Sequence, residues 1–226
     1  DIQSGDNFFH WGQRHHTPAA GATSFAWSES FRRWRDDSDA DMAELLAYLR
    51  RQTPPSQAMA AGSAFHKVLE LASYGDVLER VERDGFTFQF DVEGEFCLPQ
   101  IRELKLETRR VVGGEPVTLV GVVDTLEGRR ADDHKLTARP DAENYAPSAQ
   151  WRCYLDWFDC DVFQYNLFHG YNPAGDPGLY IIKDVVEVQF CRYPSLADDV
   201  EALVSEFVAF CKVNATDLYN NERNAA

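Results

Sequence analysis

The sequence predicts one mixed α/β (α+β) domain in which helices flank an antiparallel-rich central sheet. Two observations lead to this fold class. The hydrophobic period changes along the chain, from helical spacing before residue 75 to strand-like alternation between residues 86 and 137. A helical period then returns near residue 148, and the chain closes with a further strand and an amphipathic helix.

Amphipathic segments predict helices before and after the strands. In chain order these segments span residues 41–51, 56–74, 148–168 and 195–213. Pro54 and Pro55 end the first segment, and Gly75 ends the second.

The N-terminal part of the chain is polar but rich in aromatic residues. Four of them have a spacing that predicts one buried face of a helical cap: Phe25, Trp27, Phe31 and Trp34. An alternative is that Trp11, Trp27 and Trp34 stack on single-stranded bases.

Alternating and β-branched runs predict the strands. They span residues 86–96, 104–112, 116–124, 129–137 and 178–193. Gly113 and Gly114 form the turn between the second and third strands, and Glu127 and Gly128 form the next turn. The apolar run that enters Asp124 is typical of a buried central strand.

Charge and composition limit the possible functions. The 226 residues carry a net charge of −15, which argues against a broad basic face for a phosphate backbone, although several arginines are clustered. The five cysteines are widely spaced and form no CxxC pair, which disfavours a zinc site or a disulfide framework and fits a reducing cytoplasm. The sequence contains no candidate membrane span or signal peptide, so we expect no membrane partner.

One predicted hairpin carries residues suited to metal chemistry. With a Glu-Gly turn, Asp124 would face Ala131, and Asp124 would share one face of the ribbon with Asp133 and Lys135. Carboxylates on this diagonal, about 7–8 Å apart, can converge on Mg²⁺. The ammonium could orient a water or stabilise phosphate charge. An exposed, salt-bridged strand face would give the same pattern.

Two helical clusters add further candidates. His66 and Glu70 are four residues apart, so the imidazole could complete a metal shell while Glu70 holds its tautomer. A core histidine satisfied by its own carboxylate is the alternative. Gln150 and Tyr154 share another helix face, where they could bind phosphate, order a site or belong to an ordinary amphipathic helix.

In this order the three clusters resemble the PD-(D/E)XK nuclease superfamily, and most closely its RecB-type branch of phage exonucleases and CRISPR-adaptation nucleases. The shared pattern is GxxxHxxLE, then GxVD followed nine residues later by DxK, then QxxxY. The matching positions are Gly62, His66, Glu70, Gly121, Asp124, Asp133, Lys135, Gln150 and Tyr154. The resemblance covers about residues 60–155.

The resemblance implies one domain over residues 1–226 with a restriction-endonuclease-like core. The core would span residues 56–215, after a helical, aromatic cap over residues 1–55 and before a tail over residues 216–226.

The resemblance also implies a site and a reaction. The implied ligands of Mg²⁺ or Mn²⁺ are His66, Asp124, Asp133 and the backbone carbonyl of His134. Lys135 would be the catalytic lysine, and Gln150 and Tyr154 would organise the site. The reaction would be attack of metal-activated water on a DNA phosphodiester.

The implied biology is an exonuclease of phage-type DNA recombination, repair or processing, in the cytoplasm of a bacterial or phage-infected cell. Its partners would be single- or double-stranded DNA ends and a recombinase or single-strand annealing protein. The alternative is a catalytically inactive nuclease-fold protein that binds DNA or protein.

Three features depart from the family pattern. The cysteines are not grouped for an iron–sulfur cluster, so none is predicted. Asp132 stands where the family usually has an apolar residue, and it could solvate a strand face or perturb the metal site. The acidic net charge predicts a narrow arginine-lined channel for DNA. The candidate DNA contacts are Arg32, Arg33, Arg109 and Arg129.

Overall fold

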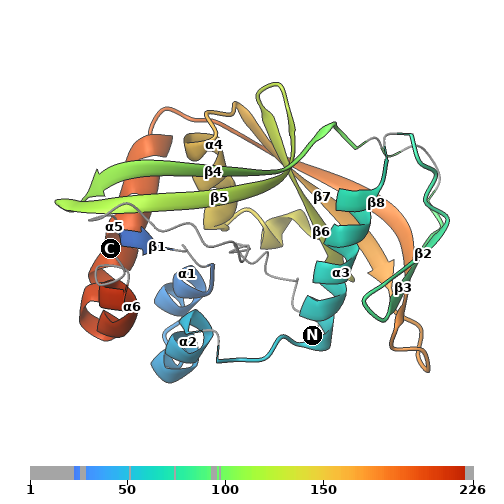
Figure 1. Ribbon diagram of the computed structural model, residues 1–226, viewed down its shortest axis with the longest axis horizontal. Coiled ribbons are helices and arrows are strands. Elements are labelled where there is room, and N and C mark those ends of the chain that lie inside the picture. The colour runs from blue at the N-terminus through green and yellow to red at the C-terminus, as the bar shows by residue number, and fades with distance from the viewer. Residues whose placement is uncertain are drawn as a thin grey trace.

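The computed structural model describes residues 23–25, 29–50, 52–73, 75–92, 96 and 98–221. Within these residues the chain forms one eight-stranded sheet. Seven strands follow the hydrogen-bonded path β1-β5-β6-β7-β8-β3-β2, and the eighth, β4, lies off this path and pairs with β5. Three neighbouring pairs are parallel (β1–β5, β6–β7 and β3–β8), whereas the other four are antiparallel. The sheet is therefore mixed, and helices flank it, which confirms the predicted fold class (Figure 1).

The strands have the following bounds: β1 (Thr23–Phe25), β2 (Arg80–Arg83), β3 (Phe86–Phe90), β4 (Ile101–Val112), β5 (Glu115–Glu127), β6 (Arg130–Thr137), β7 (Val162–Tyr171) and β8 (Leu179–Cys191). The predicted strand over residues 86–96 ends early, at Phe90. The four-residue strand β2 had no clear sequence signal. The turn between β4 and β5 lies at Gly113 and Gly114, as predicted, and both glycines have positive φ.

The helices are α1 (Glu29–Asp36), α2 (Met42–Leu49), α3 (Gln57–Leu71), the 3₁₀ helix η1 (Ala142–Asn144), α4 (Ala149–Trp157), α5 (Leu196–Asn214) and α6 (Thr216–Asn221). Serine hydroxyls cap the two helices that carry site residues: Ser56 accepts from Met59 N at the start of α3, and Ser148 accepts from Gln150 N at the start of α4. Among the described helices, none combines the length and apolar character needed to cross a bilayer.

Two clusters of buried side chains hold the helices against the sheet. Phe65 of α3 packs on Phe88 and Phe168, so α3 covers β3 and β7 (Figure 1). The larger cluster joins α1, α4 and α5 to β5 and β7, where Tyr165 is fully buried. Strand β7 contributes to both clusters, and β6 lies beside it in the sheet.

The predicted helix over residues 148–168 is wrong in its second half, because α4 ends at Trp157 and β7 begins at Val162. Asp159 has a left-handed backbone (φ 50°), which turns the chain between the two elements. Residues 163–168 are all buried. The apolar residues Phe163, Tyr165 and Leu167 alternate with the buried polar residues Gln164 and Asn166. This period-two pattern indicates a strand, and the helix prediction extended the pattern of α4 past the turn and missed it.

The N-terminal cap is only partly helical. Thr23–Phe25 form β1, which pairs in parallel with Val117–Leu119 of β5, so Phe25 belongs to a strand and not to a helix face. Helices α1 and α2 follow it. Phe31 is buried, and Trp34 packs on Phe210 of α5. Trp11 and Trp27 lie outside the described residues.

The turn between β5 and β6 lies at residues 128–129, one position later than predicted. Thr125 therefore pairs with Asp132, and Glu127 pairs with Arg130. The register differs by two residues from the prediction that Asp124 faces Ala131. Because side chains alternate with a period of two, this change leaves the predicted face of the ribbon intact.

Candidate metal centre

Three metal-ligating side chains from three elements converge beside the β5–β6 hairpin. His66 of α3, Glu103 of β4 and Asp124 of β5 each offer a ligand atom, and these atoms all lie within 4.8 Å of one another. His66 Nδ1 lies 3.2 Å from Asp124 Oδ2. The three side chains line a cavity of about 10 Å³, which is the scale of one water molecule or ion.

The electrostatics of this cluster favour a cation. Burial and the charge of Asp133 raise the pKa of Asp124 well above its usual value, although the N–H of His134 donates to its Oδ2 at 2.7 Å. Burial and the neighbouring carboxylates of Asp124 and Glu70 raise the pKa of Glu103 to about 7. Burial lowers the pKa of His66, which favours the neutral, ligating form of its ring. The cluster thus holds crowded carboxylates that a divalent cation would stabilise.

Glu103 has a strained backbone that directs it into this cluster. Its φ is 50°, in the left-handed region, although the ladder pairs on either side of it, Arg102–Thr125 and Leu104–Val123, are regular. A non-glycine residue in this region costs about 1–3 kcal/mol, and such strain concentrates at functional sites.

The side chain of Arg102 fixes the strained segment to α3. Its guanidinium donates to the carbonyls of Leu69 (2.9 Å), Pro99 (3.0 Å) and Ala72. The bonds to Leu69 and Ala72 satisfy carbonyls that α3 leaves open at its C-terminus. They also hold β4 beside the helix that carries His66.

The sequence analysis missed Glu103. The strand predicted there begins at residue 104, so Glu103 fell in the preceding loop, and one glutamate among many is no signal by itself. Its approach to His66 depends on the pairing of β4 with β5, which is a long-range contact.

Asp133 and Lys135 form a buried pair on β6. Lys135 Nζ lies 3.0 Å from Asp133 Oδ2, and Gln150 Nε2 donates to Asp133 Oδ1 at 2.7 Å. Tyr165 donates to Gln150 Oε1 at 3.3 Å, and Lys135 Nζ lies 5.9 Å from the centre of its ring. Asp133 is therefore not one of the three clustered ligands, but its charge acts on both His66 and Asp124.

Tyr154 and Gly121 hold α4 against the strand that carries Asp124. The Tyr154 hydroxyl donates to the carbonyl of Val122 at 2.8 Å. A Cβ atom at Gly121 would lie 2.9 Å from Phe158 Cε2 and 3.2 Å from Tyr154 Cε1, so only glycine permits this approach. The hydrogen bonds of Gln150 to Asp133 and of Tyr154 to Val122 lie within the protein, and phosphate binding, ordering of a site and an ordinary amphipathic helix stay predictions for this pair.

Glu70 and His134 flank the cluster. Glu70 is exposed and lines the same cavity, whereas His66 Nδ1 faces Asp124. The His134 ring is buried, and its Nδ1 lies 3.1 Å from Asn166 Nδ2. Burial lowers the pKa of His134 to about 3, so its imidazole is neutral.

Asp132 is bonded to residues other than the three clustered ligands. It accepts hydrogen bonds from Arg130 Nε (2.8 Å) and from the hydroxyl of Thr125 (3.0 Å). The expectation that Asp132 solvates a strand face is wrong, because its side chain is 2% exposed. Its charge nevertheless contributes to the raised pKa of Asp124.

The four candidate DNA-binding arginines do not line the cavity, whose cationic lining residue is Arg102. Arg129 is paired with Asp161 at 2.6 Å, and Arg32 is paired with Asp36 at 3.1 Å. Arg33 and Arg109 are exposed on α1 and β4. Arg109 pairs with Thr118, six residues before Asp124, which is about 20 Å along the strand.

The described cysteines are dispersed over the fold. The four free thiols belong to Cys153, Cys160, Cys191 and Cys211. Cys97 lies outside the described residues.

Comparisons with known proteins give little further guidance. No protein-family model matches the chain, and no curated protein matches it. A crystal structure of the protein SSO0001 is similar with a TM-score of 0.35 and 13% sequence identity, over 48% of each chain. The match thus spans about half the length of either protein, and function must be argued from the geometry of the site.

Proposed function

We propose that this protein is a metal-dependent nuclease that hydrolyses phosphodiester bonds in DNA. One observation carries the proposal: the ligand atoms of His66, Glu103 and Asp124 lie within 4.8 Å of one another, and Asp124 belongs to β5, the strand paired with β6, which carries the buried Lys135–Asp133 pair. A chelating cluster beside a fixed ammonium is suited to hydrolysis of a phosphodiester.

The residues that would hold Mg²⁺ or Mn²⁺ are His66, Glu103 and Asp124. Their donor set fits such an ion, because carboxylate oxygens suit both metals, and burial together with nearby carboxylates raises the pKa of both acids. The family resemblance adds Asp133 and the carbonyl of His134. A bound divalent cation lowers the pKa of a coordinated water and offsets negative charge on the phosphodiester.

Lys135 supplies positive charge at a fixed position. Asp133 holds its Nζ at 3.0 Å, and Gln150 in turn holds Asp133. In this role Lys135 stabilises the negative charge that develops on the phosphate and orients the attacking water. Gln150 and Tyr154 act as positioning residues, since they fix α4 to β6 and β5.

We further propose that the substrate is a DNA end, so that the enzyme is an exonuclease of DNA recombination, repair or processing. The support is the order of the motifs GxVD, DxK and QxxxY and their resemblance to RecB-type exonucleases. A recombinase or a single-strand annealing protein is the partner that this resemblance implies, and the cytoplasm is the compartment.

The test is a cleavage assay on end-labelled linear DNA and closed circular DNA, both single- and double-stranded, with Mg²⁺, Mn²⁺ or EDTA. A Lys135→Gln variant runs beside the wild type, and Lys183→Gln, an exposed lysine paired with Asp91, is the matched control. We expect metal-dependent loss of linear DNA, which Lys135→Gln should slow about 10²–10³-fold and Lys183→Gln should leave unchanged.

The form of the products separates the alternatives. Spared circles support an exonuclease, and the position of the surviving label gives its polarity. Cleaved circles keep the nuclease and overturn the exonuclease. If folded protein with either metal cleaves none of these DNAs, the nuclease proposal fails in favour of a nuclease-fold protein that only binds.

A further inference from the structure

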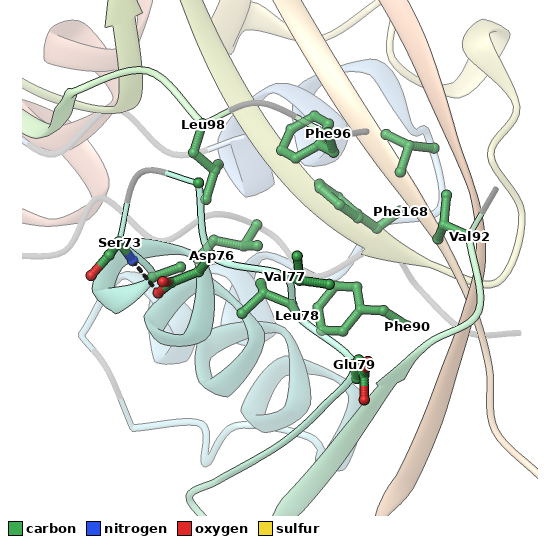
Figure 2. Close-up of a pocket in the computed structure, with 14 residues that line it drawn as sticks. Ser73, Asp76, Val77, Leu78, Glu79, Phe90, Val92, Phe96, Leu98 and Phe168 are labelled. Carbon is green, nitrogen blue, oxygen red and sulfur yellow. Dashed lines mark hydrogen bonds between the residues drawn. The ribbon is translucent and has the colours of Figure 1, made fainter. Parts of the chain in front are cut away.

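A second cavity lies beside the metal centre, between the end of α3, β3 and β7 (Figure 2). Its volume is about 450 Å³, within the range of pockets that receive an organic group. Its lining is mainly apolar, and the apolar side chains include Val77, Leu78, Phe90, Val92, Phe96 and Phe168. Figure 2 shows these side chains around one common space.

The charged groups among the described lining residues are both acidic, Asp76 and Glu79. Asp76 Oδ2 accepts a hydrogen bond from the backbone N–H of Ser73 at 2.7 Å, which fixes this carboxylate on the loop after α3 (Figure 2). A ligand that enters the cavity therefore meets apolar walls and two negative charges.

The apolar lining of the cavity reaches the protein surface. Val77, which lines the cavity, is 84% exposed. Apolar surface that continues outside a pocket is typical of sites that bind another protein.

We propose that this cavity is a docking site for a basic segment of a partner protein. The segment would insert a large apolar side chain between Phe90, Phe168 and Val77, and it would place lysine or arginine against Asp76 and Glu79. The net charge of −15 adds long-range attraction for a basic partner. A nucleic-acid strand fits less well, because its phosphates would face the same two carboxylates.

The docking site touches the walls of the metal centre. Leu69 and Leu98 line both cavities. Phe96 packs edge-on against His134, with 5.7 Å between the ring centres, and the backbone N–H of His134 holds Asp124. A partner in this pocket therefore contacts residues one layer away from the proposed metal ligands.

The test is calorimetric titration of the full chain in EDTA, so that the result does not depend on metal or on nuclease activity. The probe is a capped hexapeptide in which Phe-Leu is flanked on each side by two lysines. One control peptide replaces the lysines with glutamates, and the other replaces Phe-Leu with Ala-Ala. The double variant Asp76→Asn with Glu79→Gln tests the rim. Asp198→Asn with Glu201→Gln, two exposed acids of α5, is the matched charge control.

We expect the basic peptide to bind the wild type at least about tenfold more tightly than either control peptide. The rim variant should weaken binding at least about fivefold, and the α5 variant should not. Methyl NMR signals of Val77, Leu78 and Val92 should shift on binding. Four results would overturn the proposal: no binding at 1 mM peptide, equal binding of the glutamate peptide, unchanged binding by the rim variant, or displacement by oligothymidine.

Discussion

Asp124 and Asp132 are buried acids on two paired strands, 9% and 2% exposed, and burial raises the pKa of both. Their surroundings are otherwise opposite. Asp132 receives the guanidinium of Arg130 and the hydroxyl of Thr125. Asp124 receives one backbone N–H and lies in a cluster with the second acid Glu103.

The difference separates a structural acid from a candidate ligand. The charge of Asp132 is balanced within the protein, so this residue stabilises the β5–β6 pairing. The guanidinium beside Glu103 belongs to Arg102, which donates to carbonyls at the end of α3. Asp124 and Glu103 therefore keep a mutual repulsion that a bound cation would remove, and such arrangements mark functional sites.

The largest expected effect is on catalysis. Lys135→Gln keeps a hydrogen-bond donor for Asp133 but removes the positive charge, so cleavage should fall about 10²–10³-fold. The measurement is the single-turnover cleavage rate, with thermal unfolding as the check on folding. Cleavage within threefold of the wild-type rate would show that Lys135, like Asp132, has a structural role and not a catalytic one.

The two acids should differ in their effect on folding. Asp132→Asn weakens the bonds to Arg130 and Thr125, which should lower the free energy of unfolding by about 1–3 kcal/mol. Asp124→Asn keeps an acceptor for the His134 N–H and removes repulsion, so the metal-free protein should be at least as stable as the wild type. Urea unfolding in EDTA measures both, and a larger loss for Asp124→Asn than for Asp132→Asn would reverse the assignment.

Two glycines of the motifs give a second matched pair. Gly121→Ala places a Cβ 2.9 Å from Phe158, and this overpacking should cost about 1–3 kcal/mol and disturb Asp124 through β5. At Gly62, in α3, a Cβ meets no described atom within 4 Å, so Gly62→Ala should stabilise the helix by about 0.5–1 kcal/mol. Urea unfolding again tests the pair. Equal changes in the free energy of unfolding for the two substitutions would show that contact with α4 does not explain the glycine at position 121.

The smallest expected effect is a pH dependence of stability. The pKa of Glu103 rises from 4.5 to about 7 on folding, so the folded chain holds this proton more tightly than the unfolded chain. The contribution of Glu103 to the stability of the metal-free protein should therefore fall as the pH rises from 4.5 to 7, opposite in sign to that of His134, whose pKa is lowered to about 3. Glu103→Gln should flatten this decline, and Mn²⁺ at pH 7.5 should stabilise the wild type more than the variant. If the melting temperatures of the wild type and of Glu103→Gln change by the same amount over this interval, the raised pKa of Glu103 is excluded.

Local patterns predicted much of the fold and part of the site. The hairpin turn is displaced by one position, but Asp124, Asp133 and Lys135 kept their common face because the register changed by an even number of residues. The sequence also predicted that His66 lies on a helix and Asp124 on a strand, and that Gln150 and Tyr154 lie together on one helix.

Three features were missed. Residues 163–167 of β7 alternate apolar and polar side chains, but they closely follow α4 and were interpreted as its continuation. Strand β1 was interpreted as part of the cap, because three residues carry too little periodicity. Glu103 lies between the ladder pairs Arg102–Thr125 and Leu104–Val123, in the register that the predicted Gly113–Gly114 turn sets. It was missed because the predicted strand began at residue 104, and its positive φ has no sequence signature.

The most direct test of the metal centre is a calorimetric titration of metal-free protein with Mn²⁺. Wild type and Asp132→Asn should bind Mn²⁺ with similar affinity, whereas Asp124→Asn should bind at least about 100-fold more weakly. Absence of binding by the folded wild type, or equal binding by Asp124→Asn, would contradict the assignment of His66, Glu103 and Asp124 as the ligands.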